Sequence, residues 1–134
     1  IGGLSAPYFL NAPLMTHILA LSGSLRAASY NTALLRAAQT YAPAGTTVEV
    51  VTLHDIPFFF VVVEAAEGWP ASVRALREKI QAADALLIST PEYNSGIPGV
   101  LKNAFDWISR SNASLSCRPV IDSSSRGPGS AATA

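Results

Sequence analysis

The sequence has 134 residues, of which 49% are hydrophobic and 13% charged, and its mean hydropathy is +0.30. This length suits one domain with a hydrophobic core, and the composition excludes an intrinsically disordered chain. Nine basic residues balance nine acidic residues, so no global field would attract nucleic acid or an anionic membrane. Any anion-binding site must therefore be local.

Met15 directly precedes the first strand-like segment. We expect residues 1–14 to be an upstream extension or a cloning remnant, and residues 15–134 to form a single domain. "HILALS", from His17 to Ser22, is a short apolar run, which predicts a strand buried on both faces.

A helix and a second strand are predicted next. The apolar residues of the helix recur at i, i+3, i+4 and i+7, and we expect them to form its buried stripe: Leu34, Ala37, Ala38 and Tyr41. The turn at Pro43–Gly45 ends this helix. "VEVVTL", residues 48–53, is rich in β-branched residues and predicts the second strand.

The same alternation continues to residue 108. A helix follows Trp69 and Pro70, and its expected buried face is Val73, Leu76, Ile80 and Ala83. A strand over residues 85–90 and a further helix come next, and the apolar positions of that helix are Ile97, Val100, Leu101, Ala104, Phe105 and Ile108. Strands that alternate with helices indicate βαβ units, and therefore an α/β fold with a doubly wound parallel sheet between two helical layers.

The end of the chain has a different composition. Ser, Gly and Ala dominate from Ser109 on, and only residues 119–121 suggest a strand stub. We expect residues 111–134 to be irregular and the domain to be incomplete at its C-terminus.

The cysteine and histidine content excludes several kinds of site. Cys117 is the single cysteine, so the chain has no internal disulfide and no CxxC motif. His17 and His54 are too few for a zinc site without carboxylate ligands, and we expect no metal. No apolar run reaches the ~18 residues of a membrane helix. These features favour a cytoplasmic protein.

The segment "GSLRAASYN", residues 23–31, links the first strand to the first helix. Free backbone N–H groups and the positive end of the helix dipole meet at such a position. With the side chains of Ser24, Arg26, Ser29 and Asn31, the segment could hold a phosphate. The alternative is that Ser29 or Asn31 caps the helix and Arg26 is solvated. The segment lacks both GxxxxGK and GxGxxG, which favours a monophosphate over a nucleoside triphosphate or a dinucleotide.

A second polar loop, "TPEYNSG" at residues 90–96, follows the strand over residues 85–90. It contains Pro91, Glu92, Tyr93 and Asn94, and its Gly96 could adopt a positive φ. Such a loop suits the edge of a flat heterocycle, although a capped loop with a surface tyrosine is the alternative. In an open parallel sheet ligands bind at the carboxyl ends of the strands, where both polar loops begin.

The segments "GSLRAASYN" and "PEYNSGIPGVLKNAFDW" closely resemble motifs of the NADPH-dependent FMN reductase family, and the resemblance covers about residues 16–110. The family includes chromate, quinone and azo-dye reductases. The resemblance implies a flavodoxin-like fold with strand order 2-1-3-4-5 and three αβα layers. It also implies bound FMN, NADPH or NADH as co-substrate, a small-molecule electron acceptor, and a homodimer or homotetramer.

The resemblance also assigns roles to the residues of both loops. The ribityl phosphate of FMN is expected on four residues of the first loop: Ser24, Arg26, Ser29 and Asn31. The isoalloxazine ring is expected beside four residues of the second loop: Pro91, Glu92, Tyr93 and Asn94. No catalytic side chain is implied, because the cofactor carries the chemistry.

Two regions depart from the family pattern. Residues 58–63, "FFFVVV", stand where the family usually has polar and acidic residues, and a buried segment, an oligomer contact and a corrupted stretch all stay open. At the other end, residues 123–127 are similar to the start of a Ser/Gly-rich loop beside the flavin, but the strand before them is short and the chain then stops. A missing strand would leave a sheet edge open and the flavin pocket one wall short.

Three alternative functions remain. A flavin-binding electron carrier would share the same site residues. A non-catalytic fragment would fit the irregular tail. A hydrolase using Ser24, His54 and Asp55 is disfavoured, because the sequence lacks G-x-S-x-G and adjacent side chains on an extended segment diverge.

Overall fold

The computed structural model describes residues 15–110 and 120–125. The expected extension over residues 1–14, the cysteine at position 117 and most of the expected irregular tail lie outside these residues. No helix in the described residues has the length and apolar character needed to cross a membrane.

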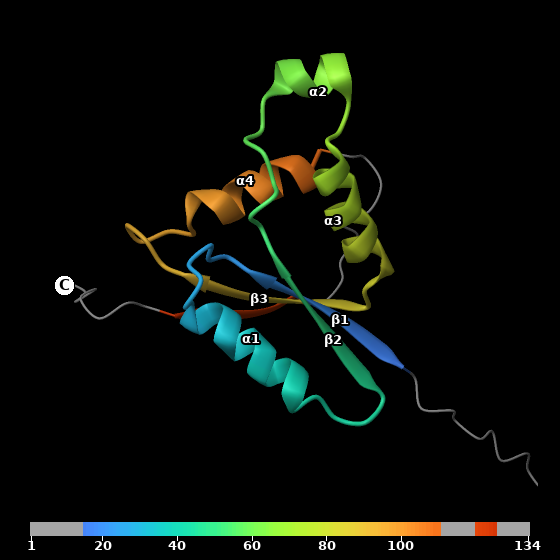
Figure 1. Ribbon diagram of the computed structural model, residues 1–134, viewed down its shortest axis with the longest axis vertical. Coiled ribbons are helices and arrows are strands. Elements are labelled where there is room, and N and C mark those ends of the chain that lie inside the picture. Colours follow the sequence, from blue (N-terminus) through green and yellow to red (C-terminus); the bar gives the residue numbers. More distant parts are fainter. Residues whose placement is uncertain (1–14, 111–119, 126–134) are drawn as a thin grey trace, which may run out of the picture.

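A four-stranded parallel sheet forms the centre of the molecule (Figure 1). Its strands are β1 (Thr16–Ser22), β2 (Thr46–Thr52), β3 (Ala85–Pro91) and β4 (Val120–Ser125). The spatial order is β2-β1-β3-β4, and every pairing is parallel. The first four positions of the expected flavodoxin-like order are therefore confirmed.

The helices are α1 (Tyr30–Thr40), α2 (Val61–Glu67), α3 (Ala71–Ala82) and α4 (Gly99–Ile108). In Figure 1, α1 lies on one side of the sheet, α3 and α4 lie on the other, and α2 extends away from both layers. This arrangement confirms the expected αβα layers.

The core is divided by the sheet into two clusters. Side chains alternate between the faces of a strand, so Leu19 and Leu21 face one cluster and Ala20 faces the other. The larger cluster joins the sheet to α3 and α4 through Leu76, Ile80, Leu101, Ala104 and Ile108. The expected buried face of α3 is confirmed, because its three apolar residues and Ala83 are all buried.

The predicted buried stripe of α1 is wrong. Leu34 is 50% exposed and Tyr41 is 83% exposed, whereas Asn31, Thr32 and Leu35 are buried. The first turn of α1 packs on polar side chains at the ends of β1 and β3, so the buried face of this helix begins with polar residues. A pattern based on apolar residues alone could not identify that face.

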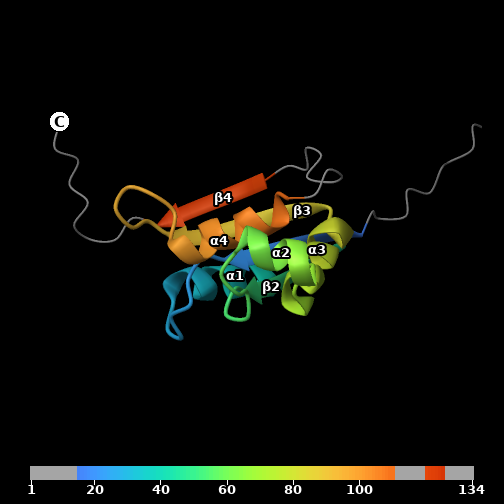
Figure 2. The same ribbon diagram turned by 90° about the horizontal axis from the view of Figure 1, so that it is seen from above.

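The C-terminal strand is longer than the predicted stub at residues 119–121. β4 pairs with β3 from Leu86 opposite Val120 to Pro91 opposite Ser125, and Figure 2 shows it beside β3, at the edge of the sheet. Ser123 and Ser124 therefore belong to a strand rather than to a loop, because β3 supplies a complete ladder of hydrogen-bonding partners.

The apolar run at residues 58–63 leads into a helix that the sequence pattern did not predict. Phe60 is the N-cap of α2, and the run of valines is a poor helix former. Phe58, Phe60, Val61 and Val62 are exposed. Phe59 instead packs edge-on against the Trp107 ring at a centroid distance of 4.9 Å. Of the three open interpretations, a fully buried segment is contradicted.

A small charge cluster joins the start of β1 and the middle of β2 to α3. Glu49 on β2 accepts a hydrogen bond from Lys79 of α3, and its second carboxylate oxygen is 3.4 Å from His17 Nε2. The contact with Lys79, with a smaller effect of His17, holds the pKa of Glu49 below its ordinary value of 4.5.

Replacing Glu49 by glutamine is expected to lower the free energy of unfolding by about 0.5 kcal/mol near neutral pH, a small effect because the pair is partly solvated. A lowered pKa in the folded state stabilises the protein above the ordinary pKa and loses that effect as pH falls through the lowered pKa. Chemical unfolding of both proteins at neutral pH and well below pH 4.5 should show the difference disappearing in acid. A difference that stays constant with pH would contradict this assignment.

Candidate functional site

A cleft of about 430 Å³ lies at the carboxyl ends of β1 and β3. The segments that leave these two strands run to opposite faces of the sheet, one to α1 and the other to α4, and such a divergence is where α/β proteins bind ligands. The cleft is lined by Gly23, Ser24, Leu25, Arg26, Phe58, Tyr93, Pro98, Gly99 and Val100.

Gly23 lets β1 and β3 end close together beneath this cleft. Its N–H donates to the Ser89 carbonyl oxygen at 2.8 Å. A Cβ at position 23 would lie 2.2 Å from Thr90 Oγ1 and 2.6 Å from Thr90 Cβ. The floor of the cleft therefore has no room for a side chain at this position.

We expect Gly23→Ala to lower the free energy of unfolding by about 1–3 kcal/mol, because the added methyl group overpacks the contact with Thr90. Denaturant unfolding measures the loss. Gly99→Ala is the matched control, since a Cβ at position 99 meets no atom within 4 Å. Equal stabilities of the two variants would contradict the role of the Gly23–Thr90 contact.

A buried polar cluster joins α1 to the two central strands. The hydroxyl groups of Ser22 and Thr32 lie 2.8 Å apart, and the Ser89 hydroxyl donates to Asn31 Oδ1 at 2.9 Å. All four side chains are buried. Because satisfied polar groups in a core have strict geometric demands, this cluster orients the N-terminus of α1 relative to the cleft. Of these four residues, only Asn31 was predicted from the sequence.

Two serines shape the first polar loop. Ser24 Oγ accepts from the Arg26 N–H at 3.3 Å, and Ser29 Oγ caps α1 by accepting from the Thr32 N–H at 3.4 Å. A hydroxyl group can accept and donate at once, so both groups keep an O–H able to donate to an anion. The capping role considered for Ser29 is therefore observed, and it does not conflict with anion binding.

Arg26 is the cationic group at the edge of the cleft. Its side chain is exposed, and its guanidinium lies 5.5 Å from the centroid of the Tyr30 ring. The segment from Gly23 to Asn31 contains no acidic residue. Hydroxyl groups, a guanidinium and the N-terminus of α1 thus form a donor set suited to a phosphate.

The second polar loop is a tight turn. Tyr93 and Gly96 exchange two backbone hydrogen bonds of 2.9 and 3.1 Å, and the residues between them, Asn94 and Ser95, have φ values of 52° and 60°. Two consecutive residues of positive φ are typical of a type I′ turn, which favours Asn at its first central position. The expectation that Gly96 would adopt the positive φ is wrong. The two central residues of the turn are Asn94 and Ser95, and Gly96 follows them as the partner of Tyr93.

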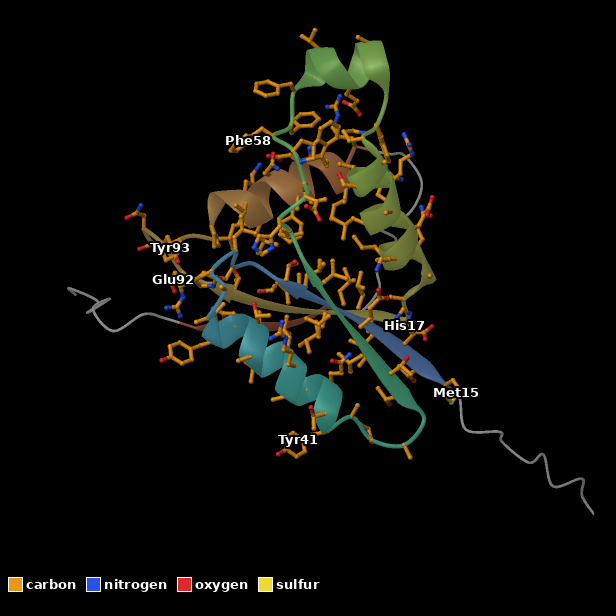
Figure 3. All side chains as sticks on the ribbon, in the orientation of Figure 1. Met15, His17, Tyr41, Phe58, Glu92 and Tyr93 are labelled. Carbon is orange, nitrogen blue, oxygen red and sulfur yellow. The ribbon has the colours of Figure 1, made fainter. Side chains whose placement is uncertain are left out.

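The structure brings together part of the predicted set. Ser24, Arg26 and Tyr93 line the cleft. Phe58 lines it too, and Figure 3 shows that Phe58 and Tyr93 come from different segments, the first from the connection that leads to α2 and the second from the second polar loop. Five predicted residues are not among the lining residues: Ser29, Asn31, Pro91, Glu92 and Asn94. Phe58, which comes from the β2–α2 connection, was not predicted as a site residue, because no local motif marks it. Pro98 and Gly99 directly follow the second loop and could have been included on that ground.

His54 does not form the contact that a hydrolase would need. Its Nε2–H donates to the Leu25 carbonyl oxygen at 2.9 Å, and its Nδ1 lies 3.1 Å from the Thr52 hydroxyl. Both ring nitrogens are therefore engaged away from Ser24, and the hydrolase alternative loses its general base. His54 instead ties the first polar loop to the end of β2. Within the described residues, no group of three or more His, Cys, Asp or Glu side chains could hold a metal ion.

Comparison with known sequences identifies relatives of this fold and site. The model of the NADPH-dependent FMN reductase family matches residues 16–132. The NAD(P)H-dependent FMN reductase PA1204 of Pseudomonas aeruginosa is 50% identical over 93 residues, which cover 69% of this chain and 50% of the relative. The quinone reductase of Escherichia coli K12 is 44% identical over 106 residues, covering 78% and 56% of the two chains. The chain thus spans about half the length of these relatives.

Solved structures agree with this assignment. FerB, a flavoenzyme NAD(P)H:(acceptor) oxidoreductase from Paracoccus denitrificans, superimposes with a TM-score of 0.72 at 32% sequence identity. The match covers 81% of this chain and 60% of FerB. The resemblance drawn from the two loop motifs and the flavodoxin-like fold is confirmed. The chain belongs to the NADPH-dependent FMN reductase family.

Proposed function

We propose that the chain binds FMN and acts as an NAD(P)H-dependent oxidoreductase on quinone-, chromate- or azo-type small molecules. The observation that carries the proposal is the cleft between two loops of different chemistry at the ends of β1 and β3. One loop presents hydroxyl groups and a guanidinium, and the other presents an aromatic side chain. This combination suits a ligand with an anionic end and a flat ring system.

The phosphate of FMN is assigned to the first loop. Ser24 and Arg26 would contact it from the wall of the cleft, and the proposal includes Ser29 and Asn31 at the start of α1. Support comes from the donor set, the helix N-terminus and the absence of acidic residues in the segment. Asn31 also has a structural role through Ser89.

The isoalloxazine ring is assigned to the second loop, beside Pro91, Glu92, Tyr93 and Asn94. The tight turn at Asn94 and Ser95 makes this loop rigid, which supports the assignment because a preorganised wall binds a flat ring with little entropic cost. Tyr93 is the member of this group that lines the cleft.

FMN, when bound, would supply the redox chemistry, namely two-electron transfer from NADH or NADPH to the acceptor. For a quinone, NAD(P)H, one proton from water and the quinone give NAD(P)⁺ and the hydroquinone. The chain's own residues bind the phosphate, orient the ring and leave one side of the cleft open. We assign no catalytic side chain.

Assembly and location complete the proposal. We propose a homodimer or homotetramer in the cytoplasm, and the exposed Val61 and Val62 of α2 support self-association, because burying apolar surface stabilises an interface. Light scattering at several protein concentrations tests the assembly, and a monomer at every concentration would contradict it.

Two measurements test the function. FMN is titrated into the purified chain and its fluorescence followed, and NADPH oxidation is then recorded with a quinone present. We expect both binding and turnover. An electron carrier would bind FMN without oxidising NADPH, and a non-catalytic fragment would do neither, so either result would overturn the proposed activity.

A further inference from the structure

The connection between β2 and α2 is held on α4 by two side chains. Asn103 Oδ1 accepts from the Phe59 N–H at 2.8 Å, and Asn103 Nδ2 donates to the Pro57 carbonyl oxygen at 2.9 Å. Trp107 Nε1 donates to the same carbonyl oxygen at 2.8 Å. One amide thus bonds the backbone on both sides of residue 58, which fixes the conformation of that residue.

The three phenylalanines of this connection have different surroundings. Phe59 packs edge-on against Trp107 at an interplanar angle of 88°. Phe58 and Phe60, its neighbours in the chain, are both largely exposed. Phe58 is 76% exposed and lines the cleft, whereas Phe60 is exposed outside it.

The cleft therefore combines polar and apolar groups. Ser24 and Arg26 contribute polar groups, while Leu25, Phe58 and Pro98 contribute apolar surface. An exposed phenylalanine ring next to a cleft offers a flat face for another ring system, and ring pairs gain stabilisation beyond the area that they bury. The ring carries no charge and attracts no anion.

We propose that Phe58 determines acceptor specificity, as the surface on which a flat, uncharged aromatic acceptor packs, and that Asn103 and Trp107 are positioning residues for it. This inference rests on the proposed reductase function and adds to it a preference for uncharged aromatic acceptors over anionic ones. The acceptor takes up two electrons and two protons, which NAD(P)H and water supply.

A binding experiment without nicotinamide tests the aromatic surface directly. Equilibrium dialysis of 1,4-naphthoquinone against the full chain is expected to give a dissociation constant about three- to tenfold higher for Phe58→Ala than for the unaltered chain. Phe60→Ala is the matched control and should bind as the unaltered chain does. Absence of naphthoquinone binding to the unaltered chain, or equal effects of the two substitutions, would overturn the proposal.

A kinetic experiment tests the specificity and the positioning. For Phe58→Ala and Asn103→Ala, the ratio of the KM for 1,4-naphthoquinone to the KM for ferricyanide is expected to rise about three- to tenfold. Lys102→Ala, on the neighbouring exposed position of α4, should leave the ratio unchanged. An unchanged ratio in Phe58→Ala would overturn the specificity role while leaving the reductase function intact. Failure of the unaltered chain to bind FMN would overturn that function, and the dialysis would still decide the role of Phe58.

Discussion

Replacing Trp107 by alanine is expected to lower the free energy of unfolding by about 3–5 kcal/mol. The Trp107 side chain is 1% exposed and is the largest fully buried side chain of the described residues. Its ring contacts Phe59, and its Nε1–H donates to the Pro57 carbonyl oxygen. The substitution removes buried surface, leaves a cavity and deprives that carbonyl of a donor. Denaturant unfolding followed by circular dichroism measures the loss.

Two further variants separate the contributions to this loss. Trp107→Phe keeps much of the ring and removes the hydrogen bond, so its expected cost is smaller, about 1–2 kcal/mol. Trp69→Ala is the control for loss of a tryptophan that is only partly buried. A loss below about 1 kcal/mol for Trp107→Ala would show that α4 and the β2–α2 connection do not depend on this contact.

Arg26→Ala is expected to weaken FMN binding by about 1.5–3 kcal/mol, which is roughly a ten- to 150-fold increase in the dissociation constant. The guanidinium stands at the edge of the cleft, and its segment contains no acidic residue that would compete with a phosphate for it. The unfolding free energy should hardly change, because the side chain is exposed. A fluorescence titration with FMN measures the affinity.

The control for this prediction is Arg36→Ala. Arg36 is exposed on α1, the helix that follows the first polar loop, so its removal changes the net charge equally without touching the cleft. Arg26→Lys keeps the charge but cannot make two parallel hydrogen bonds, and an intermediate affinity is expected. If Arg26→Ala and Arg36→Ala bind FMN equally well, the phosphate is not held by Arg26.

The sequence could predict those elements whose pattern is local. Apolar and β-branched runs identified β1, β2 and β3, and one apolar stripe identified the buried face of α3, because most of the side chains that these elements bury are apolar. The motifs also located both loops, since glycine, proline and small polar residues have strong local preferences. The resemblance to the reductase family followed from those same loops.

The pattern of apolar residues did not predict elements whose buried or paired residues are polar. The face of α1 that contains Asn31 and Thr32 is buried because Ser22 and Ser89, from two different strands, supply hydrogen-bonding partners. β4 is longer than its serine-rich sequence suggests, because β3 provides hydrogen-bonding partners along the whole of it.

The sequence by itself determined the alternation of strands and helices and the two loops that begin at the carboxyl ends of β1 and β3. Only the tertiary structure decided that Phe58 lines the cleft between those loops. Its position depends on Asn103, and Asn103 and Pro57 are separated by 46 residues in the chain. A contact across that separation depends on how the sheet and α4 pack together, and no local pattern of residue types contains this information.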